Sequence, residues 1–278
     1  MTDSGGETLG LVAGAGRLPF EIARGARDAG RRVVAVAFHG FADPALADVV
    51  DALQWVRIGE LGALLDALRT ASAHSVVVAG NVPKEQLFSV DQMRIDARGA
   101  AFLAALRDRS DDRILRALGG TLEAEGLRVE AQTRYAAHLL APAGVLGSVV
   151  PTEAQAADVA WAWPIAKAIG RLDIGQTLVV KDRSVLAVEA IEGTDAAIRR
   201  GAALAHGGAC VLKIFKPGQD PRFDAPTIGP DTVEVLARAG AALLAVEAGR
   251  TLVLERDALQ RRADAAGIAV VGIEGGSD

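Results

Sequence analysis

The sequence predicts an α/β protein of two domains, the first built on a parallel sheet and the second on a mixed sheet. Three observations lead to this prediction. The chain has 278 residues, more than the usual single domain. In its first half, short apolar or β-branched runs alternate with helical patterns, as in a parallel sheet with crossover helices. The composition shifts to Ala, Pro and Gly near residues 134–154, and a hairpin pattern follows.

The first elements set out the N-terminal domain, which we place at residues 1–133. A strand at 9–13 leads into the turn Gly14-Ala15-Gly16-Arg17-Leu18-Pro19, and a helix then runs to about Ala29. Further strands are expected at 32–38, 51–57, 75–79 and 128–133, and helices at 61–71, 97–108 and 111–125. This order is typical of a Rossmann-like domain, in which ligands bind beyond the carboxyl ends of the strands.

Residues 134–154 are expected to be a linker, and residues 155–278 a catalytic α/β domain. Thr152 is a plausible N-cap for the first helix of that domain. Strands at 177–181 and 184–189 should form a hairpin, and strands at 243–247 and 251–255 should be joined by a short turn. The other expected elements are helices at 154–169, 194–203, 230–239 and 257–266, and strands at 209–214 and 268–273.

Composition excludes several classes of protein. Aromatic residues make up 4% and the formal charge is −5, so a nucleic-acid partner is not expected. The single Cys210 rules out a disulfide framework and fits a reducing cytoplasm, which is the predicted location. Residues 1–8 lack the pattern of a signal peptide, and no apolar run reaches the length of a membrane span.

The turn after the first strand invites comparison with dinucleotide-binding folds. That fingerprint needs a third glycine, where this chain has Pro19, and an acid after the second strand, where it has His39-Gly40. A phosphate-binding Gly-Lys-Ser/Thr run is also absent from the sequence. A turn that approaches a nucleotide or sugar closely remains, and so does a tight turn without a ligand. Asn81 likewise suits a uracil or ribose edge, or an ordinary turn.

Carboxylates and cations concentrate in the second half of the chain. Glu189 and Glu192 flank the end of an apolar strand, and Gly193-Thr194-Asp195 opens a helix. Lys213, Lys216 and Arg222 precede Asp224. In phosphoryl transfer, cations neutralise the phosphates while carboxylates hold Mg²⁺ or orient water. Asp195 also suits a simple helix cap, and the rest a solvated loop of mixed charge.

These motifs resemble one known family, the metal-dependent UDP-2,3-diacylglucosamine pyrophosphatases of lipid A biosynthesis, of the alphaproteobacterial type. The resemblance runs from about Leu9 to Val271. The matching blocks are residues 9–19, Gly80-Asn81-Val82, residues 171–176, residues 187–190 with 192–195, and Asp224-Ala225-Pro226-Thr227-Ile228-Gly229. One departure is Pro83-Lys84-Glu85, where the family has a polar residue, Arg and Pro, which leaves open a cationic role for Lys84.

The resemblance implies an enzyme that uses Mg²⁺ to hydrolyse UDP-2,3-diacylglucosamine to UMP and 2,3-diacylglucosamine 1-phosphate in a cleft between the domains. Asp224 corresponds to the family's essential carboxylate and is predicted to bind metal or activate water. We expect Glu192 and Asp195 to be catalytic as well, and Glu189 to bind metal. The residues expected to bind substrate are Gly14, Gly16, Leu18, Pro19, Gly80, Asn81, Gln176, Thr194, Lys216 and Thr227.

A lipid-linked UDP-sugar as substrate further implies peripheral contact with the inner membrane, and we expect a homodimer. The aromatic patch Trp161-Ala162-Trp163-Pro164 could line an acyl groove or pack in the core. Two other functions stay open at this point. One is an oxidoreductase that binds NAD or a nucleotide sugar through the Gly14 turn, and the other is a UDP-sugar sensor without catalysis.

Overall fold

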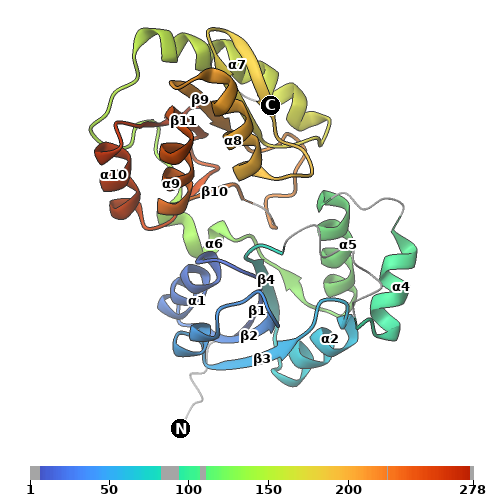
Figure 1. The fold of residues 1–278 in the computed structure, drawn as a ribbon. Helices are drawn as coiled ribbons and strands as arrows, with labels where there is room; N and C mark the ends of the chain where they lie inside the picture. The colour runs from blue at the N-terminus through green and yellow to red at the C-terminus, as the bar shows by residue number, and fades with distance from the viewer. Residues whose placement is uncertain (1–6, 83–93, 107–110, 224, 276–278) are drawn as a thin grey trace. The chain divides into compact units, whose positions relative to one another are not determined.

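The computed structural model describes residues 7–82, 94–106, 111–223 and 225–275. It confirms the α/β class and divides the chain into two compact units (Figure 1). Unit 1 comprises Met1–Ala137 with Asp220–Asp224, and unit 2 comprises His138–Gln219 with Ala225–Asp278. Each unit has its own sheet and core. None of the described helices combines the length and the hydropathy that crossing a bilayer requires.

Unit 1 contains the predicted parallel sheet. Its five strands lie in the order β3-β2-β1-β4-β5, and every neighbouring pair is parallel. The strands are β1 (Thr8–Ala13), β2 (Arg32–Phe38), β3 (Ala52–Val56), β4 (Ser75–Ala79) and β5 (Arg128–Val129). The helices are α1 (Leu18–Asp28), η1 (Pro44–Asp48), α2 (Leu61–Thr70), α4 (Ala97–Ala105), α5 (Asp111–Ala124) and α6 (Thr133–Ala136).

The direction of each crossover decides which face a helix covers. The chain moves one way along the sheet from β1 to β3 and the opposite way from β3 to β5, so right-handed crossovers put the helices on both faces. Figure 1 shows α1 and α6 on one side of the sheet and α2, α4 and α5 on the other. On the second side, Val12, Val36 and Val76 pack against α2 and α5. Phe223 joins the same core.

The predicted strand at 128–133 is wrong in its length. β5 ends at Val129, and α6 begins at Thr133. The side chain of Gln132 turns inward to bond two backbone oxygens, which ends the extended run. The expected linker region, 134–154, contains most of α6, the short helix η3 (Ala137–Leu139) and β6 (Gly144–Val145).

Unit 2 contains a mixed sheet of six strands in the order β6-β13-β11-β9-β7-β8. β13, β11 and β9 are parallel, and the predicted hairpin of β7 and β8 joins them antiparallel. The long strands are β7 (Thr177–Lys181), β8 (Ser184–Val188), β9 (Ala209–Lys213), β11 (Ala241–Glu247) and β13 (Ala269–Ile273). The helices are α7 (Glu153–Arg171), α8 (Thr194–Ala205), α9 (Pro230–Ala239) and α10 (Arg256–Ala265).

Two apolar layers hold unit 2 together. Val179, Val211 and Leu244 face the layer that contains residues of α8, α9 and α10, while alternate residues of the same strands face α7. Thr152 caps α7 as predicted, and Gln155 completes a capping box. Cys210 is fully buried, and burial raises the pKa of its thiol to about 12, which agrees with a structural role.

The two strands predicted at 243–247 and 251–255 both form, but they do not pair with each other. The second segment shortens to β12 (Leu252–Val253), which pairs in parallel with β10 (Thr227–Ile228) in a separate two-stranded sheet. The reason is that β11 lies between β9 and β13, so both of its edges are already bonded. The Asp-Ala-Pro-Thr-Ile-Gly motif thereby gains a fixed partner, because Leu252 donates its N–H to the oxygen of Pro226 at 2.8 Å.

Candidate functional site

In unit 1, the predicted substrate-binding turns lie against each other at the carboxyl ends of β1 and β4. Ala15 and Asn81 exchange two backbone hydrogen bonds, of 2.8 and 2.9 Å. A Cβ on Gly14 would lie 2.7 Å from the oxygen of Asn81, and a Cβ on Gly80 would lie 2.7 Å from the carbonyl carbon of Gly14. Glycine is therefore required at both positions because the two backbones touch.

The residues of these turns differ in exposure. Gly16 (φ +95°) and Asn81 are exposed, whereas the side chains of Leu18 and Pro19 are buried on the inner face of α1. Pro19 occupies the first turn of the helix, as predicted. A ligand at this edge therefore meets backbone, Asn81 and the N-terminus of α1.

In unit 2, predicted site residues gather at one end of the sheet. The carboxylate of Glu189 accepts a hydrogen bond from the Thr194 hydroxyl at 3.0 Å and one from the Gln176 N–H at 3.4 Å. Thr177 pairs with Lys213 across the antiparallel strands, and the Lys213 ammonium donates to the oxygen of Thr227 at 2.9 Å. Gln176, Glu189, Thr194 and Thr227, which come from three separate segments of the chain, thus lie at one end of the sheet.

Glu189 is buried and forms no ion pair with a Lys or Arg of the described residues. It is 8% exposed. A buried carboxylate is costly unless a cation or a metal balances its charge. Among the described residues, no three or more His, Cys, Asp or Glu side chains form a cluster that could hold a metal ion.

Lys216 lies near the end of β9 and is 8% exposed. Its ammonium forms an ion pair of 2.5 Å with Asp173, a residue of the Arg-Leu-Asp-Ile-Gly-Gln block. Gly170, at the end of α7, packs closely on the loop of Lys216, because a Cβ there would lie 3.2 Å from Pro217 and 3.4 Å from the Cα of Lys216. The 171–176 block is thereby held against the loop that carries Lys216.

The other two acids predicted to be catalytic point elsewhere. The Glu192 carboxylate forms an ion pair of 2.6 Å with Arg200, and Asp195 lies 3.7 Å from Arg199, both on α8. The backbone N–H of Glu192 and the Arg200 guanidinium hold the pKa of the Glu192 carboxyl below its usual range. These contacts are those of caps and surface pairs on a helix.

Asp224 and Lys84 lie outside the described residues. The residues before Asp224 are firmly attached to unit 1: Arg222 pairs with Asp220 at 2.8 Å and with Glu123 at 2.6 Å. The Phe223 ring packs in the core of unit 1, and Gln132 donates to its carbonyl oxygen. The position of the chain is thus fixed up to the residue before the predicted catalytic acid.

Comparison with known proteins identifies the family. The model of the LpxI N-terminal domain matches residues 8–139, and that of the LpxI C-terminal domain matches residues 142–271. The chain is 41% identical over 277 residues to the UDP-2,3-diacylglucosamine pyrophosphatase LpxI of Caulobacter vibrioides, which covers 96% of this chain and 97% of that protein. The chain belongs to the LpxI family. The family predicted from the sequence is therefore confirmed.

Solved structures add little to the LpxI assignment. Campylobacter jejuni biotin carboxylase matches with a TM-score of 0.30 and 13% identity, over 74% of this chain and 43% of that one. N5-carboxyaminoimidazole synthetase of Staphylococcus aureus matches with a TM-score of 0.24 and 17% identity, over 74% and 46%. The chain spans less than half the length of either protein, and likenesses this low support no statement about function.

One buried ion pair of this LpxI-family chain was not predicted. Lys167 of α7 donates to both carboxylate oxygens of Glu247, at 2.9 and 2.8 Å, and Glu247 is 1% exposed. Glu247 ends the apolar strand β11, as Glu189 follows the apolar strand β8. The signal used for Glu189, an acid at the end of an apolar strand, applies equally to Glu247. Glu247 also accepts the N–H of Phe215 at 3.0 Å.

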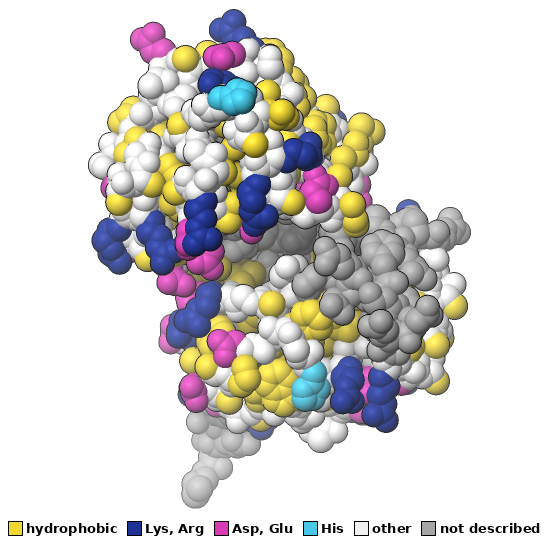
Figure 2. Space-filling model, in the orientation of Figure 1, with side chains coloured by type: hydrophobic (Ala, Val, Ile, Leu, Met, Phe, Trp, Pro, Cys, Tyr) yellow, Lys and Arg dark blue, Asp and Glu magenta, His cyan; other side chains and the backbone are white. Residues whose placement is uncertain are grey.

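The aromatic patch predicted as a possible acyl groove does not form one surface. Trp163 packs against the core of unit 2 and Ala162 is fully buried, while Trp161 is 36% exposed. On the face shown in Figure 2, Lys and Arg side chains are interspersed with Asp and Glu.

Proposed function

We propose that this protein hydrolyses the pyrophosphate bond of UDP-2,3-diacylglucosamine to UMP and 2,3-diacylglucosamine 1-phosphate. The observation that carries the proposal is the identity of 41% over nearly the whole length of a relative named for this activity. The glycine-lined edge of unit 1 and the edge of unit 2 with Glu189, Lys213 and Lys216 supply the groups that a nucleoside diphosphate requires. The oxidoreductase and the non-catalytic sensor are not favoured.

Mg²⁺ is the cofactor we propose, and Glu189 is the described residue that fits it best. Its buried carboxylate has hydrogen bonds from Thr194 and Gln176 but no ion pair with a described cation. Mg²⁺ commonly binds through one or two carboxylates together with substrate phosphates. Glu189 and Asp224 would hold the ion, which would neutralise charge on the pyrophosphate.

The reaction forms one bond and breaks one. A water oxygen bonds to a phosphorus atom, the bond from that phosphorus to the bridging oxygen breaks, and the two phosphate monoesters separate. Asp224 would accept the proton of the attacking water. The Lys213 and Lys216 ammonium groups, both nearly buried, would stabilise the negative charge that grows on the departing phosphate.

The direct test measures UMP release from UDP-2,3-diacylglucosamine with and without EDTA. Asp224→Ala should abolish turnover and leave substrate binding intact. Asp231→Ala, a nearby acid whose side chain is fully exposed, is the matched control and should keep wild-type turnover. Full turnover by the Asp224 variant would contradict its role, and turnover that survives complete removal of metal would contradict the role of Mg²⁺.

We also propose a cytoplasmic enzyme that touches the inner membrane, because its substrate is a lipid. Beside the unit 2 site, Leu172, Ile174 and Ile191 are 72%, 46% and 61% exposed. Their two loops meet where Gly175 lies against the backbone of Glu189. The double variant Leu172→Ser, Ile191→Ser should no longer bind anionic phospholipid vesicles, as measured by co-sedimentation. Equal binding by that double variant and the wild type would contradict the contact.

A homodimer is the oligomeric state we propose. Exposed aliphatic side chains such as Val150, which is 69% exposed, offer apolar surface for a second copy. Light scattering on the purified protein checks the proposal, and a monomer at micromolar concentration would contradict it.

A further inference from the structure

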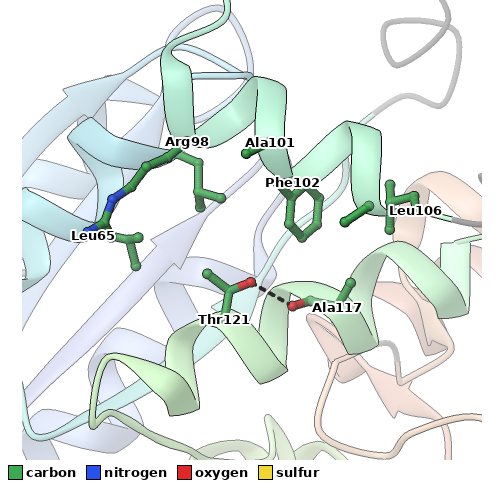
Figure 3. Close-up of a pocket in the computed structure, with 9 residues that line it drawn as sticks. Leu65, Arg98, Ala101, Phe102, Leu106, Ala117 and Thr121 are labelled. Carbon is green, nitrogen blue, oxygen red and sulfur yellow. Dashed lines mark hydrogen bonds between the residues drawn. The ribbon is translucent and has the colours of Figure 1, made fainter.

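Two apolar cavities adjoin each other in unit 1, on the side of the sheet covered by α2, α4 and α5. The first, of about 290 Å³, lies between these three helices, and Figure 3 shows Leu65, Ala101 and Ala117 around it. The second, of about 270 Å³, extends from α4 and α5 to the carboxyl ends of β1 and β4. Leu61 and Phe102 line both cavities, so the two share a wall.

The polar groups around the first cavity already have partners. The Thr121 hydroxyl donates to the oxygen of Ala117 at 2.9 Å, which the dashed line in Figure 3 marks. The Arg98 guanidinium forms an ion pair of 2.6 Å with Glu125. The remaining lining is aliphatic or aromatic. The group that binds favourably in this cavity is therefore one without hydrogen-bonding atoms, such as an alkyl chain.

The second cavity joins apolar and polar surface. Its walls include Leu103, Ile114 and Leu118, yet it also reaches Gly14 and Asn81, which lie at the edge expected to bind the sugar nucleotide. A lipid whose polar head lies at that edge would have its alkyl part directed into the helices.

We propose that the two cavities each hold one acyl chain of the diacylated sugar nucleotide, with Phe102 between the chains. This inference rests on the proposed function, and it moves the acyl site from the Trp161–Pro164 patch of unit 2 to unit 1. Each cavity is close to the lower end of the range for ligand pockets, about 300 Å³, as suits a single chain. Two neighbouring cavities of similar size match two chains on adjacent sugar positions.

The test narrows each cavity separately. Ala101→Phe narrows the first and Leu103→Trp the second, while the exposed neighbours Ala100→Phe and Ala104→Trp, which line neither cavity, are matched controls. Substrates are UDP-glucosamine with two long acyl chains and the analogue with two acetyl groups. Each methylene that loses its burial weakens binding about fourfold, so loss of two or more should raise KM at least tenfold.

We expect Ala101→Phe and Leu103→Trp to raise KM for the long-chain substrate only, with kcat and the diacetyl analogue unchanged. Circular dichroism and the control variants show whether the fold is intact. Equal KM values for narrowed and control variants, with UMP still released by the wild type, would overturn the acyl sites alone. Absence of UMP release by the wild type from both substrates would instead overturn the proposed function. In that case, calorimetry of 2,3-diacylglucosamine 1-phosphate binding tests the proposed acyl sites without turnover. Equal affinity of the narrowed and control variants for this lipid would overturn the acyl sites.

Discussion

The side-chain amide of Gln132 donates hydrogen bonds to the backbone oxygen of Phe223, at 2.7 Å, and to that of Val78, at 2.8 Å. Gln132 is 3% exposed, so these bonds form away from water. Val78 belongs to β4, which ends at the Gly80 turn, and Phe223 directly precedes Asp224. Gln132 therefore ties the chain before Asp224 to the strand that leads to the Gly80 turn, and we expect it to position Asp224.

Gln132→Leu should lower kcat much more than it raises KM. The reason is that Asp224, the proposed catalytic acid, would lose its alignment while the substrate kept its own contacts. Misplacement by about 1 Å can cost about a hundredfold in rate. Steady-state kinetics of UMP release measure both constants. Glu130→Gln controls for loss of stability, because it disturbs a buried network of unit 1 that Glu130 forms with Arg128, Tyr135, Arg134 and Arg31. A KM effect alone, with kcat unchanged, would show that Gln132 does not act through alignment.

The two acids that flank the end of β8 should differ in importance. Glu189 is buried and has no ion pair with a described cation, whereas Glu192 is paired with Arg200 at 2.6 Å. Glu189→Gln removes the charge that a metal needs and should reduce turnover at least a hundredfold, with a higher requirement for Mg²⁺. Glu192→Gln should cost less than threefold. UMP release by both variants, measured across Mg²⁺ concentrations, checks this prediction. A larger loss of turnover in Glu192→Gln than in Glu189→Gln would reassign the catalytic role to Glu192.

Most helices and strands could be predicted because they depend on sequence patterns that extend over only a few neighbouring residues. The β-branched runs, the hairpin at 177–188 and the cap at Thr152 depend on neighbours in sequence, and all three are confirmed. The partner of β12 was missed because it depends on which edges of β11 are already taken. The sequence also did not distinguish the surroundings of Glu189 from those of Glu247. Both follow apolar strand residues, and only the packing of α7 places Lys167 against Glu247. The cavities beside Phe102 likewise arise from helix packing.

Replacing only one partner of the Lys167–Glu247 ion pair should markedly lower the free energy of unfolding. Lys167→Met leaves the buried carboxylate of Glu247 with the ion pair of 3.6 Å to Arg250, so the expected loss of unfolding free energy is about 3 kcal/mol, the lower end for a broken buried pair. Adding Glu247→Gln removes the charge but keeps an acceptor for the Phe215 N–H, so the double variant should recover part of the loss. Urea unfolding in a background with Trp55→Phe and Trp161→Phe, followed by Trp163 fluorescence, measures both. Arg238→Met, which breaks the exposed pair with Glu234, is the control and should cost under about 1 kcal/mol. A loss no larger in Lys167→Met than in this control would contradict the expectation.

Glu130 should make the stability of unit 1 depend on acid pH. Its side chain is 3% exposed, and burial by itself would raise the pKa of its carboxyl. The Tyr135 hydroxyl at 2.6 Å and the Arg128 guanidinium at 3.0 Å, with the charges of Arg134 and Arg31, outweigh burial and lower that pKa. A carboxyl whose pKa is lower in the folded state stabilises the fold above its unfolded pKa, about 4.3 for Glu, and this contribution is lost as pH falls through the folded pKa.

Glu130→Gln should therefore destabilise unit 1 by about 1–3 kcal/mol at pH 7, because the amide can still accept from Tyr135 but has no charge for the arginines. The difference from wild type should shrink as pH falls below about 4.3, where the wild-type carboxyl takes up a proton. Trp55 is the one tryptophan of unit 1, so urea unfolding in a background with Trp161→Phe and Trp163→Phe reports that unit. A gap between variant and wild type that stayed constant from pH 7 to pH 3 would mean that the charge of Glu130 contributes nothing.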